Sequence, residues 1–505
     1  MVSLMTFLSR ILGFVRDVLF AGVFGAGSGM DAFLVALKIP NFGRRMFAEG
    51  AFSQAFVPVF SEARKKAPQE EVRDLLDVVS GTLGGVLGLI TLIGTLGAPL
   101  LIWVFAPGFG ADPEKHALGA ELLRWTFPYL FFISLTSLAG GVLNTHGRFA
   151  VPAMTPIILN LCLIGAVLLD GHSVNALAYA VFAAGVLQLL FQLPWLARIH
   201  MLPRPRWAWR DSRVRKIINL MVPIMIGSSV AQISLLLDTV LASFLVDGSV
   251  SWLYFADRLM EFPLGIFTLA VATVILPSLS MRHASDSPQD FSNTLDWGLR
   301  TMLVIGVPAA LGLFLLSGPL ISTLFQYREF DAHDLQMTQW ALRAYAFGFL
   351  GFSLVKVLVP GFYARQETRI PVRYAIIALC CGMAMSLSFL GLALWLDFAA
   401  PHAAMALATS LSAAINAGLL LRRLLRDRVL LPRAGWGVFA LRVLLANAAM
   451  ALVLWWVNQP LDWWIAAAME QRASQLLGVV AAAAASYFLV LWVSGVRLHQ
   501  FRSPG

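Results

Sequence analysis

The chain has 505 residues, of which 59% are hydrophobic and only 13% are charged. A soluble domain carries roughly 25% charged residues, so most of this chain is expected to lie in a membrane. The net charge of +9 comes mainly from basic residues in short loops between apolar runs, a pattern that sets membrane orientation. No soluble module is present that would bind nucleic acid, so the excess of basic residues is interpreted as a signal for membrane orientation.

The residues that usually bind metals or perform catalysis form no pattern here. The three cysteines, Cys162, Cys380 and Cys381, lie in apolar runs, and the eight histidines are scattered. No catalytic triad, paired-carboxylate motif or acidic metal-binding loop is visible, which argues against a membrane enzyme such as a polyprenyl-phosphate transferase. The segment GAGSG at 25–29 lacks the Lys-Ser/Thr of a phosphate loop and indicates a turn. We therefore expect no metal, no cofactor and no enzyme activity.

The apolar runs predict an all-α integral membrane protein. The first run lacks the basic start of a signal peptide and is expected to remain as a membrane helix. A membrane span needs about 20 apolar residues. Fourteen runs qualify, at 4–24, 31–60, 77–106, 118–145, 151–170, 175–198, 216–245, 250–280, 297–325, 334–362, 371–396, 401–424, 436–457 and 474–495. Arginine and lysine collect in the even-numbered loops, which predicts that both termini are cytoplasmic.

An internal repeat relates the first six spans to the next six. Pro58, Arg124 and Pro152 align with Pro277, Arg343 and Pro371, each pair separated by 219 residues. An even number of helices keeps the second copy parallel to the first, which predicts two lobes around an axis along the membrane normal, a transporter layout. The predicted domains are an N-terminal lobe at 1–200, a basic cytoplasmic linker at 201–215, a C-terminal lobe at 216–428 and two final helices within 429–505.

Charged residues within the predicted spans mark a candidate site. The stretch Asp31–Lys66 is apolar yet carries five charged side chains before its basic end. Charges at bilayer depth cost about 2.5 kcal/mol or more and persist where they face a polar cavity. In the repeat, Lys38 aligns with Asp257 and Arg44 aligns with Pro263, so the two similar scaffolds carry different charges. An excess of arginine favours an anionic ligand such as a phosphate, although any one of these residues is alternatively a structural ion pair or a snorkelling end residue.

Several segments resemble the MurJ/MviN family. They are SRILGFVRD (Ser9–Asp17), DAFLVALKIPN (Asp31–Asn41), RRMFAEGAFSQAFVPVF (Arg44–Phe60), SWLYFADRLMEFPLG (Ser251–Gly265), APGF (Ala106–Phe109) and PGFYARQETRIPV (Pro360–Val372). The resemblance covers nearly the whole chain. It implies membership of the multidrug/oligosaccharidyl-lipid/polysaccharide exporter superfamily and a role as a lipid II flippase in peptidoglycan and cell-wall biogenesis, which maintains cell shape.

The resemblance also implies site residues. It ties Arg10, Arg16, Arg44 and Arg258 to the pyrophosphate of the substrate in a cationic central cavity. Further residues of the matching motifs have less defined roles in substrate binding: Asp31, Asn41, Arg45, Glu49, Ser251, Asp257 and Glu261. The two final helices are expected to form a groove for the polyprenyl tail, or alternatively to pack as an appendage. Some relatives bind sodium in the second lobe, but the helix from Tyr374 to Trp395 offers no Asn or Asp, so no sodium site is predicted.

The sequence thus predicts a flippase that moves lipid II from the inner to the outer leaflet of the bacterial cytoplasmic membrane by alternating access. No nucleotide-binding motif is present, so the membrane potential or an ion gradient is the expected driver. Expected partners are lipid II, membrane lipid and the cell-wall synthesis machinery, with the chain acting as a monomer and binding no nucleic acid. The alternatives are an ion-coupled exporter of a drug or another polyprenyl-linked glycan, or a structural protein of the cell-wall machinery.

Overall fold

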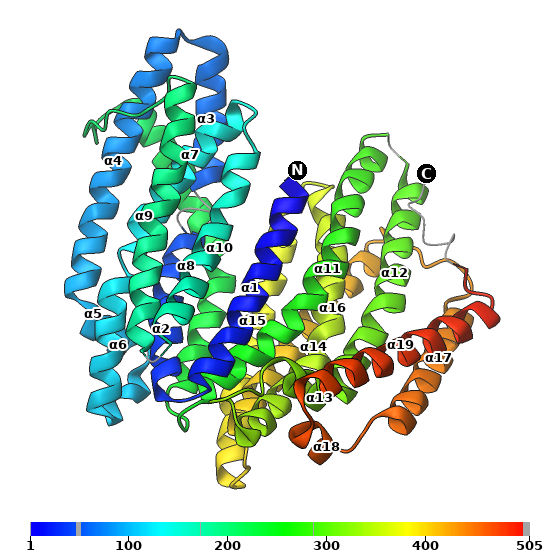
Figure 1. Cartoon of the computed structure of the whole chain (residues 1–505). Helices are drawn as coiled ribbons and strands as arrows, with labels where there is room; N and C mark the ends of the chain where they lie inside the picture. Colours follow the sequence, from blue (N-terminus) through cyan, green and yellow to red (C-terminus); the bar gives the residue numbers. More distant parts are fainter. Residues whose placement is uncertain (1, 47–51, 172, 286, 498–505) are drawn as a thin grey trace. The chain divides into compact units, whose positions relative to one another are not determined.

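The computed structural model describes residues 2–46, 52–171, 173–285 and 287–497. Every regular element in these ranges is a helix (Figure 1). This confirms the all-α prediction, which followed from long apolar runs that satisfy their backbone hydrogen bonds internally.

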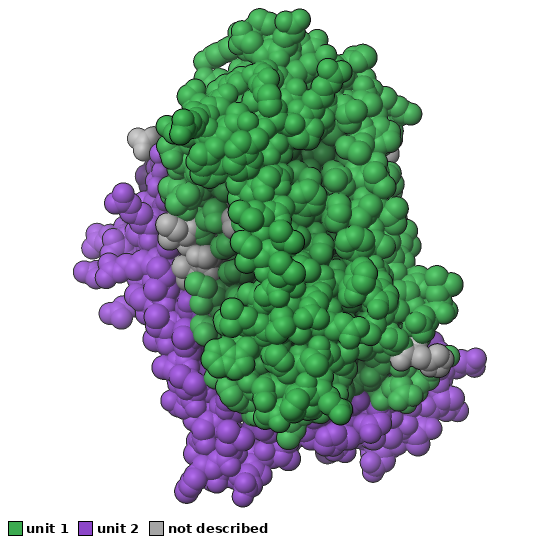
Figure 2. All heavy atoms as spheres, turned by 90° about the vertical axis from the view of Figure 1, so that its left-hand side faces the viewer, with its two compact units in different colours: residues 1–251, 327–330 green, residues 252–326, 331–505 purple. Residues whose placement is uncertain are grey.

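The chain divides into two compact units (Figure 2). The first unit contains residues 1–251 and 327–330, and the second contains 252–326 and 331–505. The helices of the first unit are α1 (Val2–Phe24), α2 (Ser28–Gly43), α3 (Ser53–Lys66), α4 (Gln69–Leu96), α5 (Ala98–Phe105), the 3₁₀ helix η2 (Pro107–Ala111), α6 (Pro113–Thr126), α7 (Tyr129–Thr145), α8 (Ala150–Leu169), α9 (Val174–Arg198) and α10 (Ser212–Ala242).

The second unit contains most of α11 (Ser249–Ala284), whose first residues belong to the first unit. It continues with α12 (Pro288–Leu315), α13 (Ser317–Leu324), α14 (Ala332–Tyr363), α15 (Arg369–Trp395), α16 (Pro401–Arg426), α17 (Trp436–Val457), α18 (Leu461–Ala466) and α19 (Met469–Val493).

The helix boundaries confirm the internal repeat. Helices α4 and α12 begin at residues 69 and 288 and end at 96 and 315, so both ends differ by 219 positions. The same offset relates α5 to α13 and the starts of α8 and α15. The copies differ at Pro128, which lies between α6 and α7, whereas the equivalent residue in the second copy, Phe347, lies within the continuous helix α14.

The turn that follows α7 is repeated in the turn that follows α14. Gly147 and Gln366 are 219 residues apart and adopt left-handed φ angles of +74° and +61°. The following amides bond back in the same way, Arg148 N–H to the Leu143 carbonyl at 2.9 Å and Glu367 N–H to the Phe362 carbonyl at 3.0 Å. Helices commonly end in one residue with left-handed φ and ψ angles, and this residue is usually glycine. Here glycine has this position in the first copy and Gln366 has it in the second.

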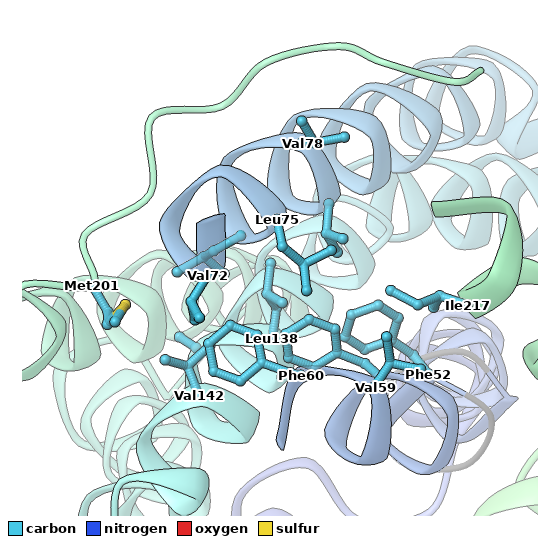
Figure 3. Close-up of a cluster of buried hydrophobic side chains, with 14 of the residues drawn as sticks. Phe52, Val59, Phe60, Val72, Leu75, Val78, Leu138, Val142, Met201 and Ile217 are labelled. Atoms are coloured by element: carbon cyan, nitrogen blue, oxygen red, sulfur yellow. The ribbon is translucent and has the colours of Figure 1, made fainter. Parts of the chain in front are cut away.

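A buried aromatic column holds α3 in the first unit (Figure 3). Phe52, Phe56 and Phe60 follow at four-residue spacing, so they share one helix face, and consecutive rings stack with centroids 5.1 Å apart. Val72 and Leu75 of α4 and Leu138 and Val142 of α7 also belong to the cluster. Dense packing of this kind fixes helices in lipid, where leaving water supplies little driving force.

Ten spans among the described residues are long and apolar enough to cross a membrane, with α6 and α7 counted together as one. The chain is therefore a multi-pass membrane protein. Helices α1, α2, α3, α10 and α11 are outside this group, and α1 carries the charges of Arg10, Arg16 and Asp17. The predicted span at 31–60 is described as two helices, because α2 ends at Gly43 and α3 begins at Ser53. The total of fourteen spans stays a prediction.

Candidate charged site

The guanidinium of Arg16 in α1 is held by polar neighbours. Its Nη2 lies 2.7 Å from Oδ1 of Asp17, and its Nη1 donates to Oδ1 of Asn160 in α8 at 3.0 Å. Asn160 in turn donates to the Ser9 carbonyl at 3.0 Å, and the Phe20 ring lies 5.5 Å from the guanidinium carbon. This network fixes the direction of Arg16, and Asp17 compensates its charge.

Asp31 lies at the centre of a second network. Its carboxylate is 1% exposed and accepts from the Lys115 ammonium at 3.1 Å and from the Gly248 amide at 2.9 Å. The amide and hydroxyl of Ser251 donate to its Oδ1 at 2.9 and 2.7 Å. Two predicted site residues, Asp31 and Ser251, therefore bind each other, and the carboxylate joins the starts of α2, α6 and α11.

Lys115 is a charged residue that the sequence argument left out of the site. It is 6% exposed, bridges Asp31 and Asp247, and places its ammonium 4.4 Å from the centre of the Phe109 ring. Two features of the sequence could have indicated it. Lys115 is in the first turn of the helix that Asp112 caps, and the repeat aligns it with Asp334, a residue of opposite charge. Asp334 accepts from the indole N–H of Trp252 at 2.8 Å in the second unit.

The cations that end α2 contact neutral side chains. Arg44 donates its Nε–H to Oδ1 of Asn41 at 3.1 Å, which joins two predicted site residues. Lys38 donates to the Thr239 hydroxyl at 3.1 Å, and Arg45 lies 3.4 Å from the Gln232 amide oxygen. All three cations are half-buried.

Arg258 and its neighbours form a group within α11 of the second unit. Its Nη1 lies 2.5 Å from Oε2 of Glu261, and its guanidinium carbon lies 4.9 Å from the centre of the Tyr254 ring. Asp257, the residue before it, is half-buried, and Glu261 is exposed. The two partners are one helical turn apart on α11, so the helix itself orients Arg258.

Two predicted site residues stand apart from these groups. Arg10 is exposed on α1, two turns before Asp17. Glu49 lies outside the described residues. The structure thus brings together Asp31 with Ser251, Asn41 with Arg44 and Arg258 with Glu261, and it adds Asp17, Asn160 and Lys115. Within the described ranges no group of three or more His, Cys, Asp or Glu side chains is arranged to hold a metal ion.

Repeated helical segments within a multi-pass membrane fold, together with half-buried arginine and lysine side chains, define a membrane protein of the transporter class. A protein-family model described as "Lipid II flippase MurJ" matches residues 20–470 of this chain. The chain is 43% identical to the probable lipid II flippase MurJ of Vibrio cholerae over 99% of this chain and 96% of that protein. It is 42% identical to the corresponding protein of Haemophilus influenzae over 98% and 99%, and 39% identical to the lipid II flippase MurJ of Burkholderia cenocepacia over 99% and 98%. The chain belongs to the MurJ family of lipid II flippases.

Solved structures agree with this assignment. A lipid II flippase MurJ in an inward closed conformation superposes with a TM-score of 0.81 at 26% identity, over 97% of this chain and 98% of that one. An inward-facing multidrug resistance MATE family transporter of the MOP superfamily superposes with a TM-score of 0.66 at 15% identity, over 83% and 95%. The second likeness concerns the fold alone.

Proposed function

We propose that this chain flips lipid II from the inner to the outer leaflet of the bacterial cytoplasmic membrane, for peptidoglycan synthesis. The observation that carries the proposal is the similarity along the full chain to relatives named lipid II flippases. The proposed activity moves the substrate without chemical conversion, so the chain is not an enzyme. Lipid II is the proposed substrate, the chain acts as a monomer, and the cell-wall synthesis machinery is the proposed partner.

Four arginines are the proposed binding groups for the pyrophosphate. Arg44 and Arg258 each present a guanidinium, which binds phosphate oxygens through a planar pair of N–H donors and stays charged at any working pH. Arg16 is the third such group, with Asp17 and Asn160 holding its direction, and Arg10 is the fourth. In this proposal the two lobes, 1–200 and 216–428, rock to carry the headgroup across while the final helices guide the tail.

Arginine replacements test the proposal. A hydrogen bond to a charged group contributes about 1.5–3 kcal/mol, which corresponds to roughly 10–150-fold. We expect Arg44→Ala and Arg258→Ala each to lower lipid II translocation in reconstituted vesicles by about tenfold or more and to abolish complementation in cells, while both variants still reach the membrane.

The matched control is Arg148→Ala, which removes an exposed arginine from the turn after α7. It should keep normal translocation. Full activity of both Arg44→Ala and Arg258→Ala would exclude a pyrophosphate site at these residues. Absence of translocation by the unaltered chain in vesicles would exclude the flippase function itself. We propose that the membrane potential drives transport. Collapsing the potential in cells tests this, and unchanged exposure of lipid II on the outer leaflet would exclude it.

A further inference from the structure

Residues 202–210, which follow α9, lie along α4 as an extended segment that we name the strap. Asp77 of α4 accepts the Arg204 amide on its side chain at 2.6 Å and the Arg206 amide on its carbonyl at 2.9 Å. The Thr82 hydroxyl accepts the Ala208 amide at 3.2 Å. The strap is therefore bonded along its length to one helix, unlike a flexible linker.

Two glycines of α4 admit the strap. A Cβ placed on Gly81 would lie 2.3 Å from the Arg206 nitrogen, and one on Gly85 would lie 2.4 Å from the Trp207 ring. Asp74, one turn before Asp77, pairs with Arg206 and lies 2.6 Å from Arg213. Beyond the strap, Arg213 also holds the pKa of the Asp211 carboxyl below its usual range through a hydrogen bond. Backbone, small residues and ion pairs thus fix the strap in one position.

The strap turns basic and aromatic side chains outward. Trp207 and Trp209 are 59% and 47% exposed with stacked rings 6.2 Å apart, and Leu202 is 52% exposed. Arg204 and Arg210 are exposed, and no ion pair joins either to an acid in the part of the chain that the structure describes. Trp207 also packs against Gly85, but the exposed side chains of Arg204, Arg210 and Leu202 have no evident use in holding the fold.

The second repeat has a comparable connection, whose side chains bond to the helix beneath it. Asp296, which is 219 residues after Asp77, accepts the Arg433 amide at 3.3 Å, so the chain after α16 crosses α12 in the same way. There the indole N–H of Trp436 donates to Asp296 at 2.6 Å, and the Arg433 guanidinium donates to Asn293 at 2.8 Å. The aromatic and basic side chains of the second copy are thus engaged with α12. In the strap, Arg206 and Trp207 contact α4, but Arg204, Trp209 and Arg210 are exposed.

We propose that the strap is a docking surface for the headgroups of anionic phospholipids. The strap lies on α4, one of the helices able to cross a membrane, so its exposed face is close to a bilayer surface. Tryptophan is enriched at the membrane–water interface, where its ring is at headgroup level. Basic clusters beside a span attract anionic lipids, each Lys or Arg contributing about fivefold to binding. An acidic protein would match the arginines but not the exposed Trp207, Trp209 and Leu202.

Lipid binding to the full-length protein tests the proposal. The detergent-solubilised chain is titrated with dioleoyl phosphatidylglycerol or dioleoyl phosphatidylcholine, and bound lipid is counted by native mass spectrometry. We expect preferential binding of phosphatidylglycerol, which Arg204→Gln/Arg210→Gln weakens by about five- to thirtyfold. Trp209→Ala should weaken it without a change of charge.

The control is Arg422→Gln/Arg426→Gln, which removes two exposed arginines from the end of α16 and changes the net charge equally. It should retain most phosphatidylglycerol binding. An equal loss in both double variants, or equal binding of the two lipids, would overturn the proposal. A third titration uses polyglutamate, and strap-dependent binding of polyglutamate without a preference between the two lipids would assign the surface to an acidic protein instead.

Discussion

At the residue scale, the buried carboxylate of Asp31 connects three helix starts. A buried ion pair is strongly destabilised when one partner is removed, because the remaining charge lacks compensation. We expect Asp31→Asn to lower the free energy of unfolding by about 2–4 kcal/mol, since an amide cannot compensate Lys115 and directs its N–H groups at the donors of either Ser251 or Gly248. The measurement is thermal unfolding of the purified chain in detergent.

Asp247→Asn is the matched control, because it makes the same change at the other partner of Lys115. The Asp247 side chain is 59% exposed, and exposed ion pairs contribute about 0–1 kcal/mol. A loss at Asp247 as large as that at Asp31 would show that burial does not govern this network. The variant Asp31→Asn/Lys115→Met removes both charges and should recover part of the loss.

The candidate site shows what residue-level reasoning from sequence can deliver. The charges of Arg16, Arg44 and Arg258 were found because a charge within an apolar run is rare and costly. The ion pair of Asp31 with Lys115 was not found, because the two residues are 84 positions apart and only the folded chain brings them together. The ion pair of Asp17 with Arg16 escaped for a related reason, since neighbouring helical residues ordinarily point in different directions.

At the element scale, the position of the strap depends on the missing side chain of Gly81. We expect Gly81→Ala to displace the strap from α4, because the added carbon would lie 2.3 Å from the Arg206 nitrogen. Limited trypsin digestion measures this, with faster cleavage after Arg206 and Arg210. Gly84→Ala is the control three residues further along the same helix, where the nearest atom would be 3.9 Å away. Equal cleavage of the two variants would contradict close packing of the strap.

The elements were predicted well where hydrophobic runs are long and less well where charges and prolines interrupt them. Helices α8, α15 and α17 begin within two residues of the predicted spans. The span predicted at 31–60 did not anticipate that α2 would end at Gly43, where the backbone continues into a wider π turn at 44–46. A local change of helix winding of this kind depends on tertiary packing, which apolar periodicity does not report.

At the scale of the whole molecule, the repeat was predictable because aligned prolines and arginines preserve their spacing across both copies. The division into compact units follows a different boundary, since α10 belongs to the first unit although it opens the second copy of the repeat. Sequence spacing reports ancestry and helix order, whereas the units reflect packing between side chains far apart in the sequence.

The topology of the whole chain provides the last prediction. Ten described spans are apolar enough to cross a membrane, and fourteen crossings require that α1, the segment formed by α2 and α3, α10 and α11 also cross despite their charges. Fourteen is even, so both termini would lie on one side, and the basic even-numbered loops favour the cytoplasm. Fusions of a fluorescent protein that is dark in the periplasm, and of a phosphatase that is active only there, should report a cytoplasmic location at both ends. A phosphatase fused in the turn near Arg328, a predicted outer loop, should be active. Termini on opposite sides would mean that one of the charged helices lies at the surface, and the paired-lobe arrangement would then fail.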